Sequence, residues 1–119
     1  MPNVLVVDDD ADLLEMVTTA LTINNMTVQS LSKGQSLFDS LDVHKPDIIL
    51  MDIYLGAMDG RILCYSLKNK EQYRDIPIIL YSAGHITASS IHQSMADDFI
   101  TKPFDITQLI NKIHSILPF

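Results

Sequence analysis

The stretch KPDIILMDIYLGAMDG, residues 45–60, decides the fold class of this 119-residue chain. It opens with a Lys-Pro-Asp turn signal and continues with an apolar run over residues 48–51. Such a run, short, continuous and rich in branched side chains, is typical of a strand covered on both faces. Asp52 follows the run, and Gly60 marks the start of a helical pattern. The stretch therefore predicts a buried strand that ends in a carboxylate.

Similar apolar runs recur along the chain and alternate with segments of helical spacing. Strands are predicted at residues 4–7, 48–51 and 76–81, with weaker candidates at 27–31 and 98–100. Helices are predicted around residues 13–21, 37–41, 62–67, 87–94 and 106–117. The segment 87–94 is rich in weak helix formers, but parallel strands on either side of it require a crossover. Asp105 stands where the last helix needs an N-terminal acid or cap. This alternation predicts an α/β fold with helices on both faces of a five-stranded parallel sheet.

Composition excludes several classes of function. The chain has 8 Lys and Arg against 15 Asp and Glu and a net charge of −7, which argues against direct nucleic-acid binding. A single cysteine, Cys64, rules out a disulfide framework within the chain and is expected to pack in the core. No signal peptide and no apolar stretch of about 20 residues is present, so we expect a cytoplasmic protein without a membrane segment. The length predicts one domain over residues 1–119 with no output domain.

Polar side chains follow the predicted strands at their carboxyl ends. Asp8 and Asp9 follow the first strand, Asp52 the third, Ser82 the fourth and Lys102 the fifth. Because these ends meet at one edge of a parallel sheet, we expect the side chains to converge there. Clustered carboxylates are costly, since two unit charges about 4 Å apart repel by about 4 kcal/mol at an effective dielectric of about 20. A protonated carboxyl, Lys102 or a divalent cation would offset this cost, and we favour Mg²⁺ together with Lys102.

Each of these residues also has an ordinary structural explanation. Acids such as Asp10 and Asp12 often only stabilise a helix N-terminus, and a single Asp or Lys-Pro after a strand is usually part of a turn. The coincidence of acids, hydroxyl and lysine at successive strand ends favours a functional site. The histidines lack the spacing of metal ligands and are assigned to solvent or loops; they are His44, His85, His92 and His114.

Four motifs carry a resemblance to a known family: VLVVDDD (4–10), PDIILMDIYLGAMDG (46–60), PIILYSA (77–83) and DDFITKPFD (97–105). With them the chain resembles the receiver domain of bacterial two-component response regulators from residue 4 to about residue 117. The resemblance implies a flavodoxin-like (βα)5 three-layer sandwich with strand order 2-1-3-4-5. It also implies a single receiver domain without an effector.

The resemblance implies a role for each acid of the site. Asp52 is the implied phosphoacceptor, which takes its phosphoryl group from the phosphohistidine of a sensor histidine kinase or a phosphotransfer protein. The implied cofactor is Mg²⁺. Asp9 and Asp52 would ligate it directly, Asp8 mainly through water, and Tyr54 through its backbone carbonyl. Such a domain catalyses only its own phosphorylation and dephosphorylation and is otherwise not an enzyme.

The resemblance also implies the parts of a switch. Lys102 would pair with a phosphoryl oxygen and precede a cis peptide bond to Pro103, while the Ser82 hydroxyl would move toward the phosphoryl group. Phe99 stands at the aromatic switch position. The implied output surface is the fourth helix, fifth strand and fifth helix, about residues 87–119, which would contact an unknown effector or output domain and allows a homodimer.

Two positions depart from the usual receiver pattern. The turn after Asp52 carries Gly56 where many receivers have Met-Pro, and Met95 stands at a position often held by Gly, which predicts a different cap for the fourth helix. Tyr54 and Gly84 lie where they would tune the lifetime of the phosphoryl group.

Three other functions compete with this interpretation. A phosphorylation-independent receiver-like interaction module is the main alternative. A phosphohydrolase with a D-x-D nucleophile at Asp8 is disfavoured, because Asp12 stands where Thr or Val is usual and there is no room for a cap domain. A flavin-binding relative is disfavoured, because the loop after the first strand is acidic.

Overall fold

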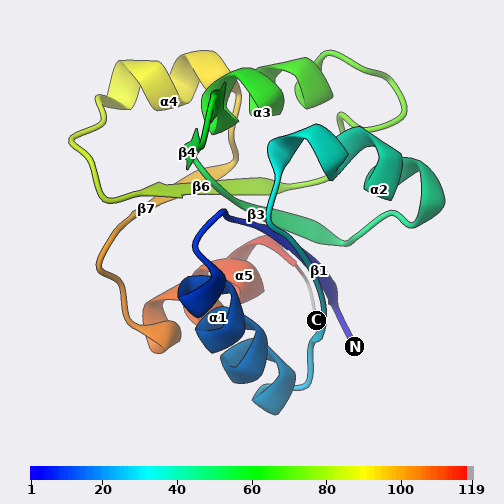
Figure 1. The fold of residues 1–119 in the computed structure, drawn as a ribbon, viewed down its shortest axis with the longest axis vertical. Helices are drawn as coiled ribbons and strands as arrows, with labels where there is room; N and C mark the ends of the chain where they lie inside the picture. The colour runs from blue at the N-terminus through cyan, green and yellow to red at the C-terminus, as the bar shows by residue number, and fades with distance from the viewer. Residues whose placement is uncertain (118–119) are drawn as a thin grey trace.

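The computed structural model describes residues 1–117 and contains a five-stranded parallel sheet (Figure 1). Its strands lie in the order β2-β1-β3-β6-β7, and each neighbouring pair is parallel. The strand bounds are β1 (Asn3–Val7), β2 (Thr27–Leu31), β3 (Ile48–Asp52), β6 (Ile78–Ser82) and β7 (Asp98–Thr101). Counted along the chain, these are the five predicted strands in the predicted order 2-1-3-4-5.

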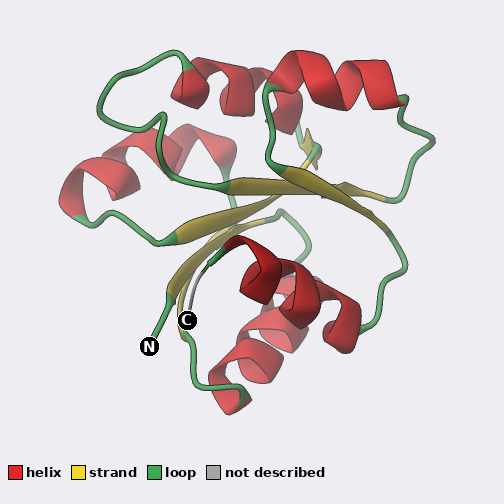
Figure 2. Cartoon of the chain, turned by 180° about the vertical axis from the view of Figure 1, so that it is seen from behind, coloured by secondary structure: helices red, strands yellow, loops and turns green. Residues whose placement is uncertain are grey.

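Helices cover both faces of this sheet and complete the predicted three-layer sandwich. The two views place α1 and α5 on one face and α2, α3 and α4 on the other (Figures 1 and 2). The helix bounds are α1 (Ala11–Ile23), α2 (Leu37–Val43), α3 (Gly60–Lys68), α4 (Ala88–Ser94) and α5 (Ile106–Ile116), with a short 3-10 helix, η1 (Gly34–Ser36), before α2. Within residues 1–117, none of these helices has the length and apolarity needed to cross a membrane.

Alternation along the strands divides the hydrophobic core into two clusters. Along β1, Leu5 and Val7 pack with α2 and α3, whereas Val4 and Val6 pack with α1 and α5. All four side chains are fully buried, because a parallel sheet with helices on both faces has no solvent-facing side. Because both faces of each strand are covered, the strands appear in the sequence as continuous apolar runs.

The segment after Asp52 folds into a small hairpin that the sequence did not reveal. Its strands β4 (Tyr54–Leu55) and β5 (Met58–Asp59) pair antiparallel across a turn in which Gly56 has φ +63°. Strands of two residues are too short to show alternation, so the sequence indicated only a turn. Strand β6 also starts at Ile78 instead of residue 76, directly after Pro77, which has no N–H to donate to a neighbouring strand.

The structure confirms one prediction about a helix end and corrects another. The side chain of Asp105 caps α5 by accepting a hydrogen bond from the N–H of Gln108 at 2.7 Å. Met95 ends α4 with φ 66°, the left-handed conformation that glycine adopts most easily. The prediction of a different cap is therefore wrong: the methionine adopts the backbone conformation of a glycine-type cap.

A lysine whose side chain is mostly buried links the loops at the amino ends of β6 and β7. The Nζ atom of Lys68, near the end of α3, donates to the Asp97 carboxylate at 2.8 Å and to the carbonyl of Ile76 at 2.9 Å. The same carboxylate accepts the N–H of Ile78 at 2.8 Å. This cluster lies at the opposite end of the strands from Asp52.

Candidate functional site

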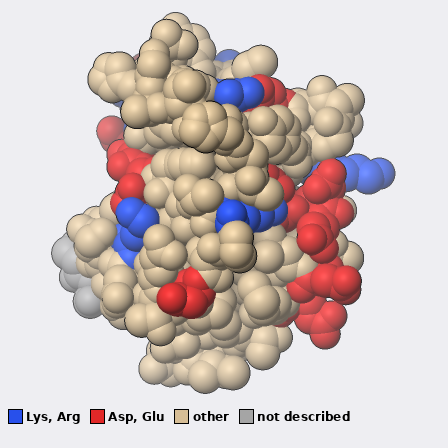
Figure 3. Space-filling view, turned by 90° about the vertical axis from the view of Figure 1, so that its left-hand side faces the viewer, with Lys and Arg blue, Asp and Glu red and all other residues tan. Residues whose placement is uncertain are grey.

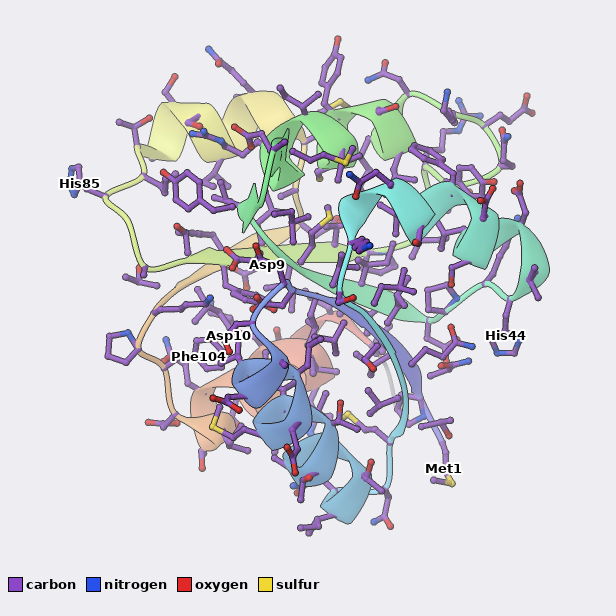
Figure 4. The ribbon with its side chains drawn as sticks, in the orientation of Figure 1. Met1, Asp9, Asp10, His44, His85 and Phe104 are labelled. Carbon is purple, nitrogen blue, oxygen red and sulfur yellow. The ribbon has the colours of Figure 1, made fainter. Side chains whose placement is uncertain are left out.

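Three carboxylates meet at the carboxyl ends of β1 and β3. Asp8, Asp9 and Asp52 each offer an oxygen, and these oxygens lie within 4.8 Å of one another. Asp8 and Asp52 are buried and Asp9 is exposed. Figure 4 shows Asp9 where β1 ends and Asp10 where α1 begins, with His44 and His85 far to either side. The predicted acidic cluster is therefore present.

The register of the sheet explains why these acids converge. Strands β1 and β3 are parallel neighbours in which Val7 lies opposite Met51, so the next residues, Asp8 and Asp52, emerge side by side. The chain then turns into α1, whose first N–H groups, those of Asp12 and Leu13, are accepted by the Asp10 side chain. Asp10 is thus a helix cap, as its position predicted, and does not belong to the cluster.

Lys102 lies between the two buried acids. Its Nζ atom is 3.0 Å from Oδ2 of Asp52 and 3.4 Å from Oδ2 of Asp8. Its backbone N–H donates to the carbonyl of Ser82 at 2.8 Å, and its peptide bond to Pro103 is cis, as the resemblance implied. Burial by itself would lower the pKa of Lys102, but the hydrogen bond and charge of Asp52, with those of Asp8, outweigh it and raise the pKa. Lys102 therefore carries its positive charge at neutral pH.

Burial controls the titration of Asp8. Its side chain is 0% exposed, and the resulting loss of hydration raises the pKa of Asp8 above the ordinary value. Hydrogen bonds from the N–H of Asp10 and the hydroxyl of Tyr81 oppose this rise, while the nearby charge of Asp52 adds to it. A cation close to this pair of acids would stabilise their ionised forms.

Ser82 stands at the end of β6, the strand next to β3. It is fully buried, and its Oγ atom accepts the N–H of Gly84 at 3.1 Å. In the register of the two strands, Asp52 lies opposite Tyr81, so Ser82 comes one residue beyond the aspartate. The hydroxyl is thus at the predicted edge of the sheet.

The structure places Tyr54 and Phe99 differently with respect to the acids. The N–H of Tyr54 donates to Oδ1 of Asp52 at 3.1 Å, so its backbone is tied to the site, while its side chain is exposed. Phe99 is half-buried on β7, opposite Leu80 of β6 and away from the strand ends that carry the acids. Its role as a switch stays a prediction, as does the Tyr54 carbonyl as a metal ligand.

Tyr81 is a residue of the site that the sequence did not predict. The hydroxyl of Tyr81 donates to Oδ2 of Asp8 at 2.9 Å, and its ring lies 5.0 Å from Nζ of Lys102. The available signal was its place in the run Ile78-Ile79-Leu80-Tyr81, because a hydroxyl in a doubly covered strand needs a buried partner.

The donors of the cluster suit a hard divalent cation. All are carboxylate oxygens, the ligand type that Mg²⁺ prefers, and exposed Asp9 leaves room for the waters that this ion retains. Among the described residues it is the one group of three or more such side chains that could hold a metal. Cys64 takes no part, since it is buried in the core and burial raises the pKa of its thiol to about 12.

The surface around the cluster is mixed in charge. Figure 3 views the left-hand side of Figure 1, where acidic side chains gather along one edge and a few Lys and Arg lie among uncharged atoms. Beside Lys102 is an open hollow of about 560 Å³ whose other walls are mainly apolar: Leu13, Met16, Ala83, Pro103 and Phe104.

Two curated proteins are similar in sequence over nearly the whole chain. The DNA-binding dual master transcriptional regulator RpaA of Synechocystis sp. is 33% identical over 122 residues, covering 98% of this chain and 49% of the relative. The heme response regulator HssR of Staphylococcus aureus is 34% identical over 119 residues, covering 98% of this chain and 52% of the relative. The chain thus spans about half the length of these curated relatives.

Solved structures share the fold. The chemotaxis response regulator CheY4 of Vibrio cholerae superposes with a TM-score of 0.90, at 22% identity, over 98% of this chain and 99% of that one. A family model described as the response regulator receiver domain matches residues 4–114. Because this match includes Asp8, Asp9, Asp52, Ser82 and Lys102 and nearly all of the sheet, the chain belongs to the response regulator receiver domain family.

Proposed function

We propose that this domain is the phosphoacceptor switch of a two-component phosphorelay, with Asp52 as the residue that is phosphorylated. The observation that carries the proposal is the position of Asp52. Its carboxylate lies at the end of β3, within hydrogen-bonding distance of Lys102 and in one cluster with Asp8 and Asp9. Membership of the receiver family and the oxygen-rich cluster support this role.

The transfer needs an aspartate held in one orientation. Oδ1 of Asp52 accepts the N–H of Tyr54, and Oδ2 accepts a hydrogen bond from Nζ of Lys102. In the proposed step, a carboxylate oxygen of Asp52 attacks the phosphorus of a phosphohistidine. A P–O bond forms, the P–N bond breaks, and the imidazole nitrogen keeps the electron pair and gains a proton. The result is an acyl phosphate on the domain's own side chain, so the domain catalyses only its own modification and its reversal.

The acids and Lys102 have complementary roles in this proposal. Asp8, Asp9, Asp52 and the Tyr54 carbonyl would hold Mg²⁺, which would screen charge between the phosphoryl oxygens and the carboxylates. The ammonium group of Lys102 lies within reach of both Asp8 and Asp52. In the proposed step it turns from Asp8 toward a phosphoryl oxygen on Asp52.

Phosphorylation would change the output surface through Ser82 and Lys102. A phosphoryl group adds a charge of about −1.5 to −2 and new acceptor oxygens beside them. We propose that Ser82 moves toward these oxygens and that the Phe99 ring follows, altering α4, β7 and α5. Within the described residues this surface covers 87–117, while Pro118 and Phe119 of the predicted surface lie outside them.

The partners follow from the chemistry. A sensor histidine kinase or a phosphotransfer protein would supply the phosphohistidine, and the apolar hollow beside Lys102 is a suitable contact for it. Because kinases make phosphohistidine from ATP, we place the domain in the cytoplasm. The effector would be an output domain, a separate protein or a second copy through α4, β7 and α5.

The proposal is tested with a small phosphodonor. Incubation with acetyl phosphate and MgCl₂ should raise the intact mass by one phosphoryl group, and hydroxylamine should remove it. Asp52→Asn should abolish the gain. The matched control is Asp39→Asn, which changes an exposed acid in the first turn of α2 and should label like the wild type.

The other outcomes identify the alternatives. Equal labelling of Asp52→Asn shows that another residue is the acceptor. No labelling, together with no Mg²⁺-dependent shift of backbone amides near Asp52, favours the phosphorylation-independent interaction module. Repeated turnover of a generic phosphate ester favours a phosphohydrolase.

A further inference from the structure

Tyr81 brings a hydroxyl out of the hydrophobic core into the acidic cluster. It is the fourth residue of β6, directly before Ser82, and its side chain is 2% exposed. Its ring packs among the residues between the sheet and helices α1 and α5, while its hydroxyl donates to Oδ2 of Asp8 at 2.9 Å. The three residues before it in β6 are Ile, Ile and Leu, so packing alone does not require a hydroxyl here.

The hydroxyl fixes one oxygen of a carboxylate that water does not reach. Asp8 is fully buried, and its Oδ1 atom accepts the N–H of Asp10 at 2.9 Å. Its Oδ2 atom has two donors, the Tyr81 hydroxyl at 2.9 Å and Nζ of Lys102 at 3.4 Å. Tyr81 is the closer donor, so it makes the shorter of the two hydrogen bonds to this oxygen.

The ring of Tyr81 makes a second set of contacts, with the loop that carries Lys102. Nζ of Lys102 lies 5.0 Å from the ring centroid, within the range of a cation–π interaction. Phe104, two residues after Lys102, packs edge-on against the same ring at 5.7 Å between centroids. One side chain thus contacts both the acid and the lysine of the site.

We infer that Tyr81 is a positioning residue, whose hydroxyl aims the Asp8 carboxylate into the acidic cluster and leaves Lys102 available to Asp52. This inference rests on the proposed function, because it concerns how the same site holds Mg²⁺ and accepts a phosphoryl group. Without the hydroxyl, Asp8 loses its closer donor and draws Lys102 toward itself and away from Asp52. Both cation binding and phosphoryl transfer should then weaken.

The test compares two buried tyrosines whose hydroxyls each donate to an aspartate. Tyr81→Phe removes the hydroxyl and keeps the ring against Phe104 and Lys102. Tyr73→Phe is the matched control, because Tyr73 is also buried, at 4% exposed, and its hydroxyl donates to Asp42 on α2, outside the acidic cluster. Both variants should lose stability, and Tyr81→Phe should lose more, because its acceptor Asp8 is buried whereas Asp42 is exposed.

The site readouts should separate the two variants. By calorimetric titration with MgCl₂, Tyr81→Phe should bind the ion about tenfold more weakly, the scale found when a partner of a metal ligand is lost, and Tyr73→Phe should match the wild type. In EDTA, the ¹³C resonance of the Asp8 carboxyl should shift in Tyr81→Phe alone. Initial labelling by acetyl phosphate should slow in the same variant.

A double-substitution cycle gives a second, independent check. In an Asp8→Asn background, adding Tyr81→Phe should cause no further loss of Mg²⁺ affinity, because the carboxylate that the hydroxyl orients is gone. Tyr81→Leu, which resembles the rest of the β6 run, should repeat the loss seen with Phe.

The outcomes distinguish the inference from the function on which it rests. If the wild type binds Mg²⁺ and labels at Asp52 but Tyr81→Phe behaves like Tyr73→Phe in every readout, the inference alone is overturned. If the wild type neither binds Mg²⁺ nor gains a phosphoryl group, the proposed function and the inference are overturned together.

Discussion

The Nζ atom of Lys102 lies 3.0 Å from Oδ2 of Asp52, which joins two residues 50 positions apart in the chain. The same ammonium group lies 3.4 Å from Oδ2 of Asp8, 94 positions away. One cation therefore balances two buried acids whose strands are neighbours in the sheet. Because it is shared, this lysine should affect both the stability of the resting domain and the chemistry of Asp52.

Replacing Lys102 with Met keeps the aliphatic stem and removes the charge. The free energy of unfolding at neutral pH should fall by about 1.5–3 kcal/mol, because two carboxylates lose a charged donor. Initial labelling by acetyl phosphate should slow by about 10²-fold or more, since the phosphoryl oxygens lose a fixed cation. Urea unfolding and intact mass measure the two effects.

The control for Lys102 is Lys112→Met. The Nζ atom of Lys112 pairs with the Asp98 carboxylate at 3.1 Å near the surface, so its removal should cost at most about 1 kcal/mol and leave labelling unchanged. Equal effects of the two substitutions would show that Lys102 acts only as another ion pair.

Asp8→Asn should stabilise the metal-free protein at neutral pH. Burial raises the pKa of Asp8 above its ordinary value of 3.8, so the folded state keeps a proton that the unfolded state has already lost. Stability linked to Asp8 is therefore fully present below about pH 3.8 and is lost as the pH rises through the raised pKa. Asparagine does not titrate, so its advantage should be small in acid and grow toward neutral pH.

Urea unfolding in EDTA at a series of pH values measures this difference. Asp12→Asn is the control, because Asp12 is an exposed acid in the first turn of α1. Its removal should lower stability by about 0.3–1 kcal/mol at neutral pH through the helix dipole. An Asp8→Asn advantage that is largest in acid would contradict the prediction.

Gly60→Ala should damage the site by moving its backbone. A Cβ at Gly60 would overlap the carbonyl oxygen of Asp52 and come within 3.0 Å of the Cα atom of Ile53, neither of which is a flexible side-chain end. We expect a loss of about 1–3 kcal/mol or more and slower labelling of Asp52.

Gly56→Ala is the control for Gly60→Ala, because it replaces a glycine without the steric overlap. Gly56 has φ +63°, but a Cβ there meets no atom within 4 Å. Its replacement should cost about 1–2 kcal/mol from backbone strain and leave the Asp52 carboxylate in place. Thermal melts and intact mass of both variants give the comparison. Unchanged labelling of a folded Gly60→Ala protein would refute the proposed displacement.

Met95→Gly should stabilise the domain, although it removes a large side chain. Met95 has φ 66° at the end of α4 and is 48% exposed, so the relief of backbone strain should outweigh the weaker apolar packing. We expect a gain of about 0.5–1 kcal/mol. Met16→Gly, at an exposed position inside α1, should instead lose about 1 kcal/mol. Thermal unfolding of both variants checks the opposite signs.

The sequence predicted most of this fold because the signals at the strand ends are local. A doubly covered strand must be apolar throughout, so the first polar residue after the run marks where it ends, as with Asp8 and Asp52. The order of the strands came from the resemblance, since periodicity does not say which strands are neighbours. The two-residue strands of the β4–β5 hairpin were missed because they show no period.

The partner of a buried polar group was harder to predict. Tyr81 and Asp8 are 73 positions apart, and their contact depends on β6 and β1 lying on either side of β3. The sequence shows a tyrosine in an apolar run, but only the arrangement in space shows which acceptor it reaches. Phe99 is the opposite case. The resemblance implies a role for it, but that role belongs to a second conformation of the domain.

The hydrogen bonds of Lys68 hold together the end of the sheet opposite Asp52. Its ammonium group holds the Asp97 carboxylate and the Ile76 carbonyl, which pins the entries to β6 and β7 far from Asp52. The two ends of the sheet should therefore tolerate substitutions differently. Substitutions in the loops after the strands can change the choice of partner and the lifetime of the phosphoryl group, whereas substitutions around Lys68 should impair folding. Engineers who want new signalling specificity in this domain should diversify the former loops and leave the latter intact.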